Sequence, residues 1–409
     1  MEMTPRQRIA AALEHRESDV LPIDFGAMRS TGINALAYAR LKEYLGIREG
    51  QVRVYDIFQQ LAEPEEAVLR RMGGDVVQLH RLAPSFGIPI DEWKEAILQD
   101  GTPCQVPARL DPVRLENGDL AIYYGPTQIA VMPAGNYYYN QVHHPFAECE
   151  TAADVDRIPF GEITDRELAF LQANARALYE HTDYAILGEF GGNILEAGQS
   201  SFGYEKFMYL LAAEPGLVHH FFERLAAVYL RDLKKYLDAV GRYLSVIQLG
   251  DDLGAQGGPQ ISPAMYRAMI KPYHRALYGY VREHSPAKVF LHCCGSIRSL
   301  IPDLIDAGVQ VLNPVQISAQ NMDPATLKRE FGRELTFWGG GADLQYTVPS
   351  ASLSDIQKET RQLIEIFAPG GGYVFTTVHN IQATVPPDKI LAIYDAALAY
   401  RVEQRRNRR

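Results

Sequence analysis

The chain has 409 residues, of which 47% are hydrophobic and 22% charged, a composition typical of soluble globular proteins with a large core. Fifty acidic and 40 basic residues give a formal net charge of -10, which argues against the basic face that a general nucleic-acid binder needs. No apolar run approaches the roughly 18 residues that span a bilayer, so we expect no membrane partner. Cys104, Cys149, Cys293 and Cys294 form no disulfide framework, and a reducing, cytoplasmic location is expected.

The N-terminal part of the chain combines helical patterns with one apolar strand pattern. Apolar residues at helical spacing predict a short amphipathic helix within the first 20 residues. The apolar run over 20–25 predicts a strand, and residues 33–45 and 56–72 have helical patterns. Asp56 stands at the start of the last of these segments, so its simplest role is that of a helix N-cap.

Residues 101–147 interrupt this rhythm. The segment is rich in Pro, Gly and Tyr, and it contains short alternating stretches that are typical of strands joined by turns. We interpret it as a β-hairpin or meander inserted into a single domain that spans residues 1–409. The segment is expected to act as a lid or an oligomer contact, or to supply the aromatic walls of a ligand site.

From about residue 160 the chain alternates between helices and short apolar runs. Helices are expected over about 164–180, 204–213, 216–240, 263–284, 296–307, 324–331, 351–366 and 387–400. Strands are expected over 184–187, 244–249, 288–291, 309–312, 334–338 and 372–375. This alternation predicts parallel strands with crossover helices, and therefore an α/β fold.

Each predicted strand ends in a loop with polar or Gly-rich chemistry. Examples are the loops that follow residues 187, 249, 291, 312, 338 and 375. In a (β/α)8 TIM barrel the carboxyl ends of all strands converge on one face, which carries the active site. A doubly wound sheet would instead collect such loops at one switch point. Six loops spread along the chain favour the closed barrel.

The most specific local signal is the pair His292 and Cys294 at the end of one predicted strand. Residues i and i+2 of a strand share a face, so these two side chains point together and Cys293 points away. An imidazole and a thiolate at this spacing can bind one zinc ion, and a catalytic zinc needs a third protein ligand. His379, at another strand end, is the best candidate. In the alternative interpretation the cysteines are small core residues and the histidine is hydrogen-bonded.

Several carboxylates lie in the same set of loops. Asp251 and Asp252 follow one strand, and either carboxylate has two possible roles, as a metal ligand or general acid–base group, or as a cap or ion-pair partner. Glu189 stands between glycines, which suggests close approach of the backbone to a ligand.

At these residues the chain resembles the uroporphyrinogen decarboxylase superfamily, and within it the branch of cobalamin-linked methyltransferases. The resemblance is strongest from about residue 245 to 400 and rests on three stretches. They are Gly250-Asp251-Asp252-Leu253-Gly254 with the following Ile261–Tyr266 and Lys271-Pro272-Tyr273, His292-Cys293-Cys294-Gly295-Ser296, and His379-Asn380-Ile381 with Pro386–Ile390. The family fold is a (β/α)8 barrel, in agreement with the alternation of elements.

The resemblance implies a zinc-dependent methyltransferase. In that branch a His-x-Cys-Gly element and a later cysteine hold a catalytic zinc. Here His292 and Cys294 match the element, and His379 stands where the second cysteine would fall, as it does in the decarboxylase branch. The arginine-rich loop by which the decarboxylase binds carboxylate arms is reduced to Arg29, although Asp56 falls near its essential aspartate.

The favoured hypothesis is therefore methyl transfer from a small methyl ether or methylamine to a corrinoid cofactor carried on a partner protein. In this scheme Asp251, Asp252 or Glu189 supplies a fourth ligand or a proton. The substrate pocket is expected to contain Asp56, Arg29, Tyr266, Asn313 and Gln316. The sequence does not fix the oligomeric state, although the family often dimerises and a homodimer is possible. The alternatives are a metal-free decarboxylase of a tetrapyrrole or polycarboxylate, and a non-catalytic corrinoid- or tetrapyrrole-binding protein.

Overall fold

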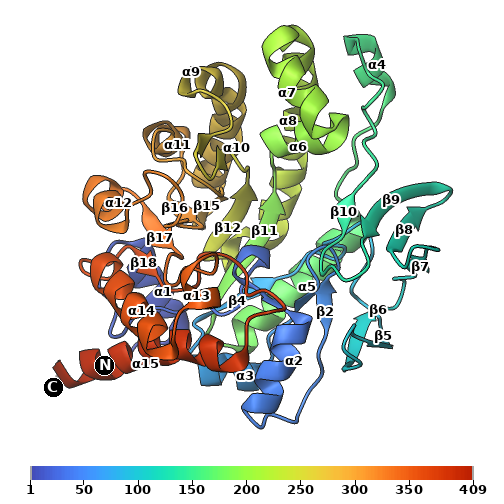
Figure 1. Ribbon diagram of the computed structural model, residues 1–409. Coiled ribbons are helices and arrows are strands. Elements are labelled where there is room, and N and C mark those ends of the chain that lie inside the picture. The colour runs from blue at the N-terminus through green and yellow to red at the C-terminus, as the bar shows by residue number, and fades with distance from the viewer. Residues whose placement is uncertain (1, 408–409) are drawn as a thin grey trace.

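Seven parallel strands form the central sheet, and the computed structural model describes the chain over residues 2–407 (Figure 1). The strands are β4 (Val76–Leu79), β11 (Ala185–Gly191), β12 (Val246–Gly250), β15 (Lys288–His292), β16 (Val311–Asn313), β17 (Thr336–Trp338) and β18 (Tyr373–Val374). Six of them lie on the predicted apolar runs, and β4 was missed. Their order across the sheet is their order along the chain, which is typical of a barrel and excludes the reversal of a doubly wound sheet.

The two edge strands of this curled sheet are bridged by the segment over residues 20–25. Ile23 forms an isolated parallel bridge with Phe375, directly after β18. On its other side Ile23 accepts a backbone hydrogen bond of 2.7 Å from Asp75, directly before β4. The expected strand over 20–25 thus makes a single bridge and does not form a full ladder.

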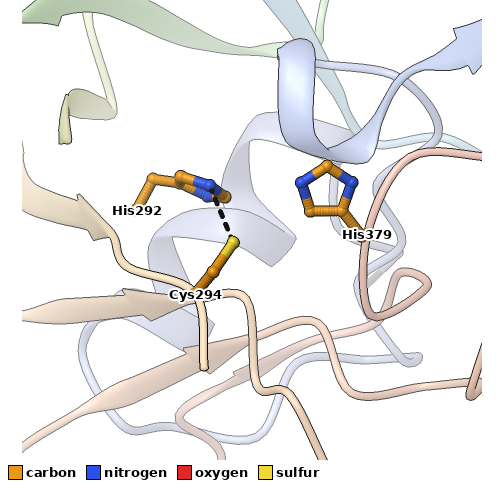
Figure 2. Close-up of side chains that lie close together, drawn as sticks. All are labelled: His292, Cys294 and His379. Carbon is orange, nitrogen blue, oxygen red and sulfur yellow. Dashed lines mark hydrogen bonds between the residues drawn. The ribbon is translucent and has the colours of Figure 1, made fainter. Parts of the chain in front are cut away.

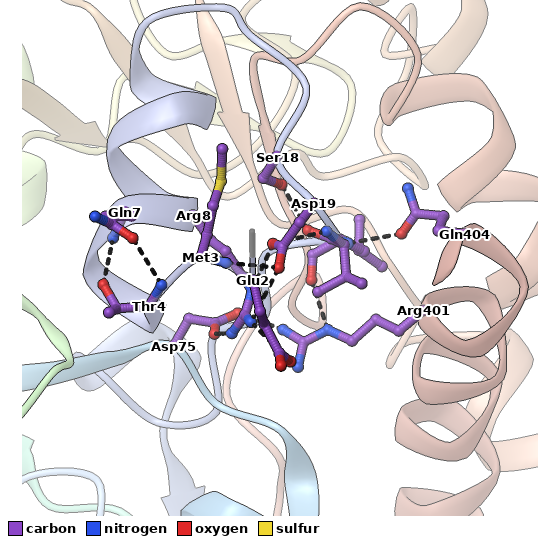
Figure 3. Close-up of polar contacts among 12 residues, drawn as sticks. Glu2, Met3, Thr4, Gln7, Arg8, Ser18, Asp19, Asp75, Arg401 and Gln404 are labelled. Carbon is purple, nitrogen blue, oxygen red and sulfur yellow. Dashed lines mark hydrogen bonds and ion pairs between the residues drawn. The ribbon is translucent and has the colours of Figure 1, made fainter. Parts of the chain in front are cut away.

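Buried ion pairs fix this segment against both ends of the chain (Figure 3). The Asp75 carboxylate accepts hydrogen bonds from the Ile23 backbone N–H at 2.9 Å, from Arg8 at 3.1 Å, and from Arg401. Arg401 also donates to the Leu21 carbonyl at 2.6 Å. Because one buried carboxylate joins the first helix, the bridging segment and the last helix, removing it would break the ion pair of Arg401, whereas Arg8 would keep its ion pair with Asp19.

Large apolar side chains fill the space enclosed by the strands. One buried cluster takes a residue or two from every strand of the sheet, among them Leu187, Phe290 and Trp338. Helix α1 (Pro5–Leu13) adds Ile9 and Leu13 to this cluster, so it closes the amino-terminal end of the sheet. The interior is therefore a packed core, and the space for a ligand lies at the opposite, carboxyl end.

The crossover helices pack on the outside of the sheet (Figure 1). They are α5 (Asp165–His181), α8 (Pro215–Val240), α10 (Lys271–His284), α11 (Ile301–Ala307), α12 (Pro324–Phe331), α14 (Leu353–Phe367) and α15 (Pro387–Asn407). The predictions are confirmed closely for most of these helices. Helix α11 begins later than expected, and the segment predicted as one helix over 263–284 is α9 (Pro263–Met265), a π-helical turn (Tyr266–Ile270) and α10. Among the described residues, no helix has the length and apolar character needed to cross a membrane.

The shorter helices lie at the ends of the sheet and between its larger elements. Three of them, α4 (Ala152–Arg157), α6 (Leu195–Phe202) and α13 (Thr347–Ser350), were not predicted. The others are α2 (Ala35–Tyr44), α3 (Glu66–Met72) and α7 (Tyr204–Ala213). Helix α6 follows β11 at the carboxyl end of the sheet, so the missed helix matters for the site.

Small antiparallel sheets occupy the part of the chain between β4 and β11. Strands β5 (Trp93–Ile97) and β6 (Pro103–Pro107) form a hairpin, and β7 (Val113–Arg114), β8 (Leu120–Tyr124), β9 (Thr127–Met132) and β10 (Asn140–Gln141) form a four-stranded sheet. The β-rich character expected for 101–147 is present. A two-stranded pair, β13 (Gly254–Ala255) with β14 (Gly258–Pro259), follows β12.

The helix expected over 56–72 is wrong in its first half. Asp56 ends β2 (Val54–Asp56), which pairs with β3 (Leu61–Ala62) and, through it, with β1 (Ile33–Asn34). Its carboxylate accepts from the Gln59 N–H at 2.8 Å and so closes a turn in place of a helix N-terminus. Only the region of α3 is helical. The apolar residues of this short hairpin pack into the core, and their spacing along the chain happens to resemble that of a helix, which explains the wrong prediction.

Candidate metal centre and cavity

The alternation of side chains along β15 brings His292 to the carboxyl end of the enclosed space. Phe290 belongs to the interior cluster, whereas Leu291 and Cys293 pack in the outer core between sheet and helices. Cys293 is fully buried, and its thiol accepts the Leu253 N–H at 3.3 Å. The predicted opposition of Cys293 to His292 and Cys294 is therefore what the structure shows.

Three side chains form a group whose donor atoms could bind one metal ion (Figure 2). The donor atoms of His292, Cys294 and His379 all lie within 4.8 Å of one another. The Cys294 Sγ is 3.4 Å from the His292 Nε2. Ligands of a tetrahedral zinc ion with Zn–N near 2.0 Å and Zn–S near 2.3 Å are separated by about 3.5 Å, so this pair already has the required spacing.

The imidazole of His292 is held in the orientation that a metal ligand needs. Its Nδ1 is 2.8 Å from the Asn313 Oδ1, which makes Nδ1 the protonated nitrogen and leaves Nε2 as the donor toward Cys294. Asn313 is itself fixed, because Ser30 donates to its Oδ1 at 2.8 Å and its Nδ2 donates to the Trp338 carbonyl at 2.8 Å. Such a second layer of hydrogen bonds sets ligand orientation in metal sites.

The other two donors are uncharged in the metal-free protein. Burial, together with the neighbouring His292, lowers the pKa of His379 to about 4, so its imidazole is neutral at pH 7. Burial and the nearby Asp252 carboxylate raise the pKa of the Cys294 thiol well above its usual value. A bound divalent cation reverses this preference, since a coordinating thiol loses its proton outright. Metal binding is thus coupled to proton release from Cys294.

A cavity of about 350 Å³ opens beside this group at the carboxyl ends of β11, β12 and β15. His292 and His379 form part of its wall, and most of the remaining lining residues are polar. The lining consists of Met28, Arg29, Ser30, Phe58, Gln59, Gln141, Glu189, Gly191, Asn193, Glu196, Ser200, Gln248, Gly250, Asp252, His292 and His379. The volume accommodates a small organic molecule.

Glu196 is a site residue that the sequence analysis missed. It lies in the first turn of α6, where its Oε2 accepts from the Asp252 N–H at 2.9 Å and from the Asn193 amide at 2.5 Å. Burial, reinforced by the carboxylates of Asp252 and Asp251, raises the pKa of Glu196 to about 8. A signal did exist, because the loop after β11 continues with Asn193 and, three residues later, an acidic residue.

The acidic pair after β12 separates into two roles. Asp252 lines the cavity, and its Oδ1 accepts the Cys294 N–H at 2.7 Å and lies 3.8 Å from the His292 Nε2. Asp251 is fully buried and accepts the N–H groups of Leu195 and Glu196 at 2.9 Å, at the start of α6. The capping alternative therefore describes Asp251, and its expected catalytic role is replaced by a structural one.

Arg29, Asp56 and Glu189 form a second polar group in the cavity wall. The Arg29 guanidinium pairs with the fully buried Asp56 carboxylate and lies 4.0 Å from the Glu189 Oε1. Glu189 also accepts a hydrogen bond of 3.0 Å from Gln78. Arg29 and Glu189 face the cavity as expected, whereas Asp56 lies behind Arg29.

The other expected pocket residues support the site from behind. Tyr266 is fully buried and its hydroxyl is 3.1 Å from the His274 Nδ1, and the His274 Nε2 is 3.0 Å from the Asp251 Oδ2. Gln316 accepts the Gly295 N–H at 2.7 Å and so holds the backbone next to Cys294. Tyr266, Gln316 and the buried Asn313 are therefore positioning groups and do not line the cavity.

Known proteins of one family match most of this chain. A family profile described as "Uroporphyrinogen decarboxylase (URO-D)" matches residues 148–400, more than half of the sequence. The uroporphyrinogen decarboxylase of Salinispora tropica is 26% identical over 312 residues, which cover 73% of this chain and 78% of that protein. The corresponding protein of Thioalkalivibrio sulfidiphilus is 24% identical over 204 residues, so the match spans 48% of this chain and about half, 53%, of the relative.

A solved structure extends the similarity to the whole fold. A methyltransferase from Methanosarcina mazei superposes with a TM-score of 0.61 and covers 98% of this chain and 99% of its own. Its sequence identity of 15% means that the likeness concerns the fold alone. The family profile, which matches more than half of the sequence, shows that the chain belongs to the uroporphyrinogen decarboxylase family.

Proposed function

We propose that this protein is a zinc-dependent methyltransferase that moves a methyl group between a small methylated substrate and a corrinoid carried on a partner protein. The demethylating direction, from a methyl ether or methylamine to the corrinoid, is favoured. The observation that carries the proposal is the group of His292, Cys294 and His379 in the wall of the cavity. A fold shared with a methyltransferase from Methanosarcina mazei supports it.

The residues of this group fit a catalytic zinc site. Two imidazoles and a thiol are ligands that zinc prefers, and three protein ligands leave a fourth position open for a substrate. His292 has its donor nitrogen fixed by Asn313, so little reorganisation is needed on binding. Zinc at this position would act as a Lewis acid that polarises the heteroatom bearing the methyl group.

The cavity residues supply binding and proton transfer. Glu196 retains a proton at neutral pH and places it at the cavity wall, where a leaving oxygen or nitrogen needs one. Its Oε2 is occupied by two N–H donors, so the proton resides on Oε1. Asp252 orients the backbone N–H of Cys294, and the Gln248 amide offers a neutral contact to the substrate.

A second candidate, decarboxylation of a tetrapyrrole or polycarboxylate, is favoured by the names of the curated relatives. The charge of the cavity argues against it. Among the described lining residues Arg29 is the one guanidinium or ammonium group, and it is already paired with Asp56. Glu189 and Asp252 add negative charge to the same wall, so a substrate with several carboxylates would be repelled.

Turnover assays distinguish the two functions. The zinc-loaded protein is incubated with cob(I)alamin and, in turn, aryl methyl ethers and methylamines, and the formation of methylcobalamin is followed by its visible absorbance. We expect methyl transfer that is lost in Cys294→Ala. A parallel assay with uroporphyrinogen follows the release of carbon dioxide. Decarboxylation that is unaffected by Cys294→Ala would replace the proposal with the second candidate.

A further inference from the structure

The two histidines of the metal group are oriented by different parts of the molecule. His292 is held by Asn313, which lies at the end of the neighbouring strand β16. His379 lies in the loop after β18, directly before Asn380 in the chain. Asn380 is almost fully buried, and its side-chain amide makes four hydrogen bonds. The position of the second imidazole therefore depends on what fixes the loop at Asn380.

The contacts of Asn380 define the direction of its amide. Its Nδ2 donates to the Gln59 Oε1 at 2.6 Å and to the Arg29 carbonyl at 3.4 Å. Its Oδ1 accepts from the Gln382 Nε2 at 2.5 Å and from the Tyr138 hydroxyl at 3.2 Å. The same hydroxyl hydrogen is shared with the Gln382 Oε1, which lies closer at 2.6 Å, so one phenol hydroxyl contacts both amides.

Tyr138 comes from a distant part of the chain. It belongs to the turn between β9 and β10, in the β-rich segment over 101–147, and lies 242 positions from Asn380 in sequence. The next residues tie this segment to the other side of the cavity, because Gln141 lines the cavity and donates to the Ser200 carbonyl at 3.0 Å. The segment thus spans the mouth from α6 to the loop that carries His379.

We propose that Tyr138 is a positioning residue for His379, and that the β-rich segment is through it a working part of the metal centre. This inference rests on the proposed zinc site. Loss of the hydroxyl removes one anchor from the Gln382 and Asn380 side chains, and the loop that carries His379 is then held less firmly beside His292 and Cys294. The segment is accordingly more than a cover for the cavity or a contact between subunits.

Cobalt and zinc binding test this role without any turnover. Tyr138→Phe removes one oxygen atom and keeps the ring, so folding should be preserved, and thermal unfolding verifies this. Tyr137→Phe is the matched control, because Tyr137 is the preceding residue and faces a separate apolar cavity. Zinc affinity is measured by competition with a chromophoric chelator, and the visible bands of the Co²⁺ form report the ligand geometry.

Wild-type protein and Tyr137→Phe should bind one metal ion with equal affinity and identical Co²⁺ spectra. Tyr138→Phe should bind zinc about tenfold more weakly and should show altered Co²⁺ bands. Replacing a residue that orients a metal ligand typically weakens metal binding by about 10- to 100-fold, and the smaller loss is expected here. Gln382→Met should have a similar effect, and the double variant should lose little more, since both changes break one network.

The outcomes separate the two proposals. Wild-type affinity and an unchanged Co²⁺ spectrum in Tyr138→Phe would overturn the positioning role and leave the zinc site intact. Absence of metal binding by the wild-type protein would overturn the zinc site itself, and the role of Tyr138 with it.

Discussion

Replacement of Glu196 by glutamine tests the proton that we assign to this side chain. Glutamine has the shape of the protonated acid, and its carbonyl can accept the same hydrogen bonds from Asn193 and Asp252. It cannot ionise. The variant and the wild-type protein should therefore be equally stable in acid, where Glu196 carries its proton, and should diverge as the pH rises.

The magnitude follows from the pKa. The ordinary value is 4.5, and burial with the nearby carboxylates raises the pKa in the folded protein to about 8. Between these values the folded state holds more protons than the unfolded state, so the free energy of unfolding falls with rising pH. At about 1.4 kcal/mol per pH unit the full loss is roughly 5 kcal/mol. Because water in the cavity screens these charges, we expect about half of this loss in the free energy of unfolding.

The measurement is urea unfolding of the chelator-treated proteins between pH 5 and pH 9. Wild-type stability should decline across this interval relative to Glu196→Gln and should level off above about pH 8. Glu205→Gln, an exposed acid on α7, is the control and should follow the wild-type curve. Parallel curves for wild type and Glu196→Gln would refute the assignment of the proton.

Three further predictions concern the metal group and the core. We expect elemental analysis to find near-stoichiometric zinc in the wild-type protein and none in Cys294→Ala or His379→Ala; zinc retained in either variant would remove that residue from the ligand set. Asn313→Ala should weaken zinc binding about 10- to 100-fold in a chelator competition, because His292 loses its orienting partner, and an unchanged affinity would contradict this. Trp338→Phe should lower the free energy of unfolding by about 1–3 kcal/mol, since the buried Asp24 carboxylate loses the indole N–H at 2.8 Å; unfolding in urea that matches the wild type would contradict it.

The metal group was predictable because its signal is local. His292 ends β15 and Cys294 follows two residues later, and continuing the pleat of the strand places them on one face with Cys293 opposite. His379 could be added because all parallel strands of a barrel deliver their following loops to one end. Glu196 was not predicted because its raised pKa depends on burial and on the carboxylates of Asp252 and Asp251, which only the tertiary fold brings beside it.

Three residues that were expected in the pocket lie behind its wall. Tyr266, Asn313 and Gln316 were expected in the pocket, because polar residues near strand ends commonly face a ligand. Whether such a side chain faces the cavity or a neighbouring loop depends on its hydrogen-bond partners. Tyr266 contacts His274, which in turn contacts Asp251. Asn313 contacts His292, and Gln316 accepts the Gly295 N–H. None of these pairings has a signature in the sequence.

The sequence by itself determined most of the alternation of strands and helices, the parallel sheet, and the common orientation of His292 and Cys294 at the end of β15, since hydrophobic period and strand pleat are properties of neighbouring residues. Tertiary structure alone decided that Asp251 caps α6 while Asp252 faces the cavity, and that Tyr138 reaches the loop of His379 from 242 positions away. Contacts between residues so far apart in the chain depend on how the whole fold packs, and no local pattern encodes them.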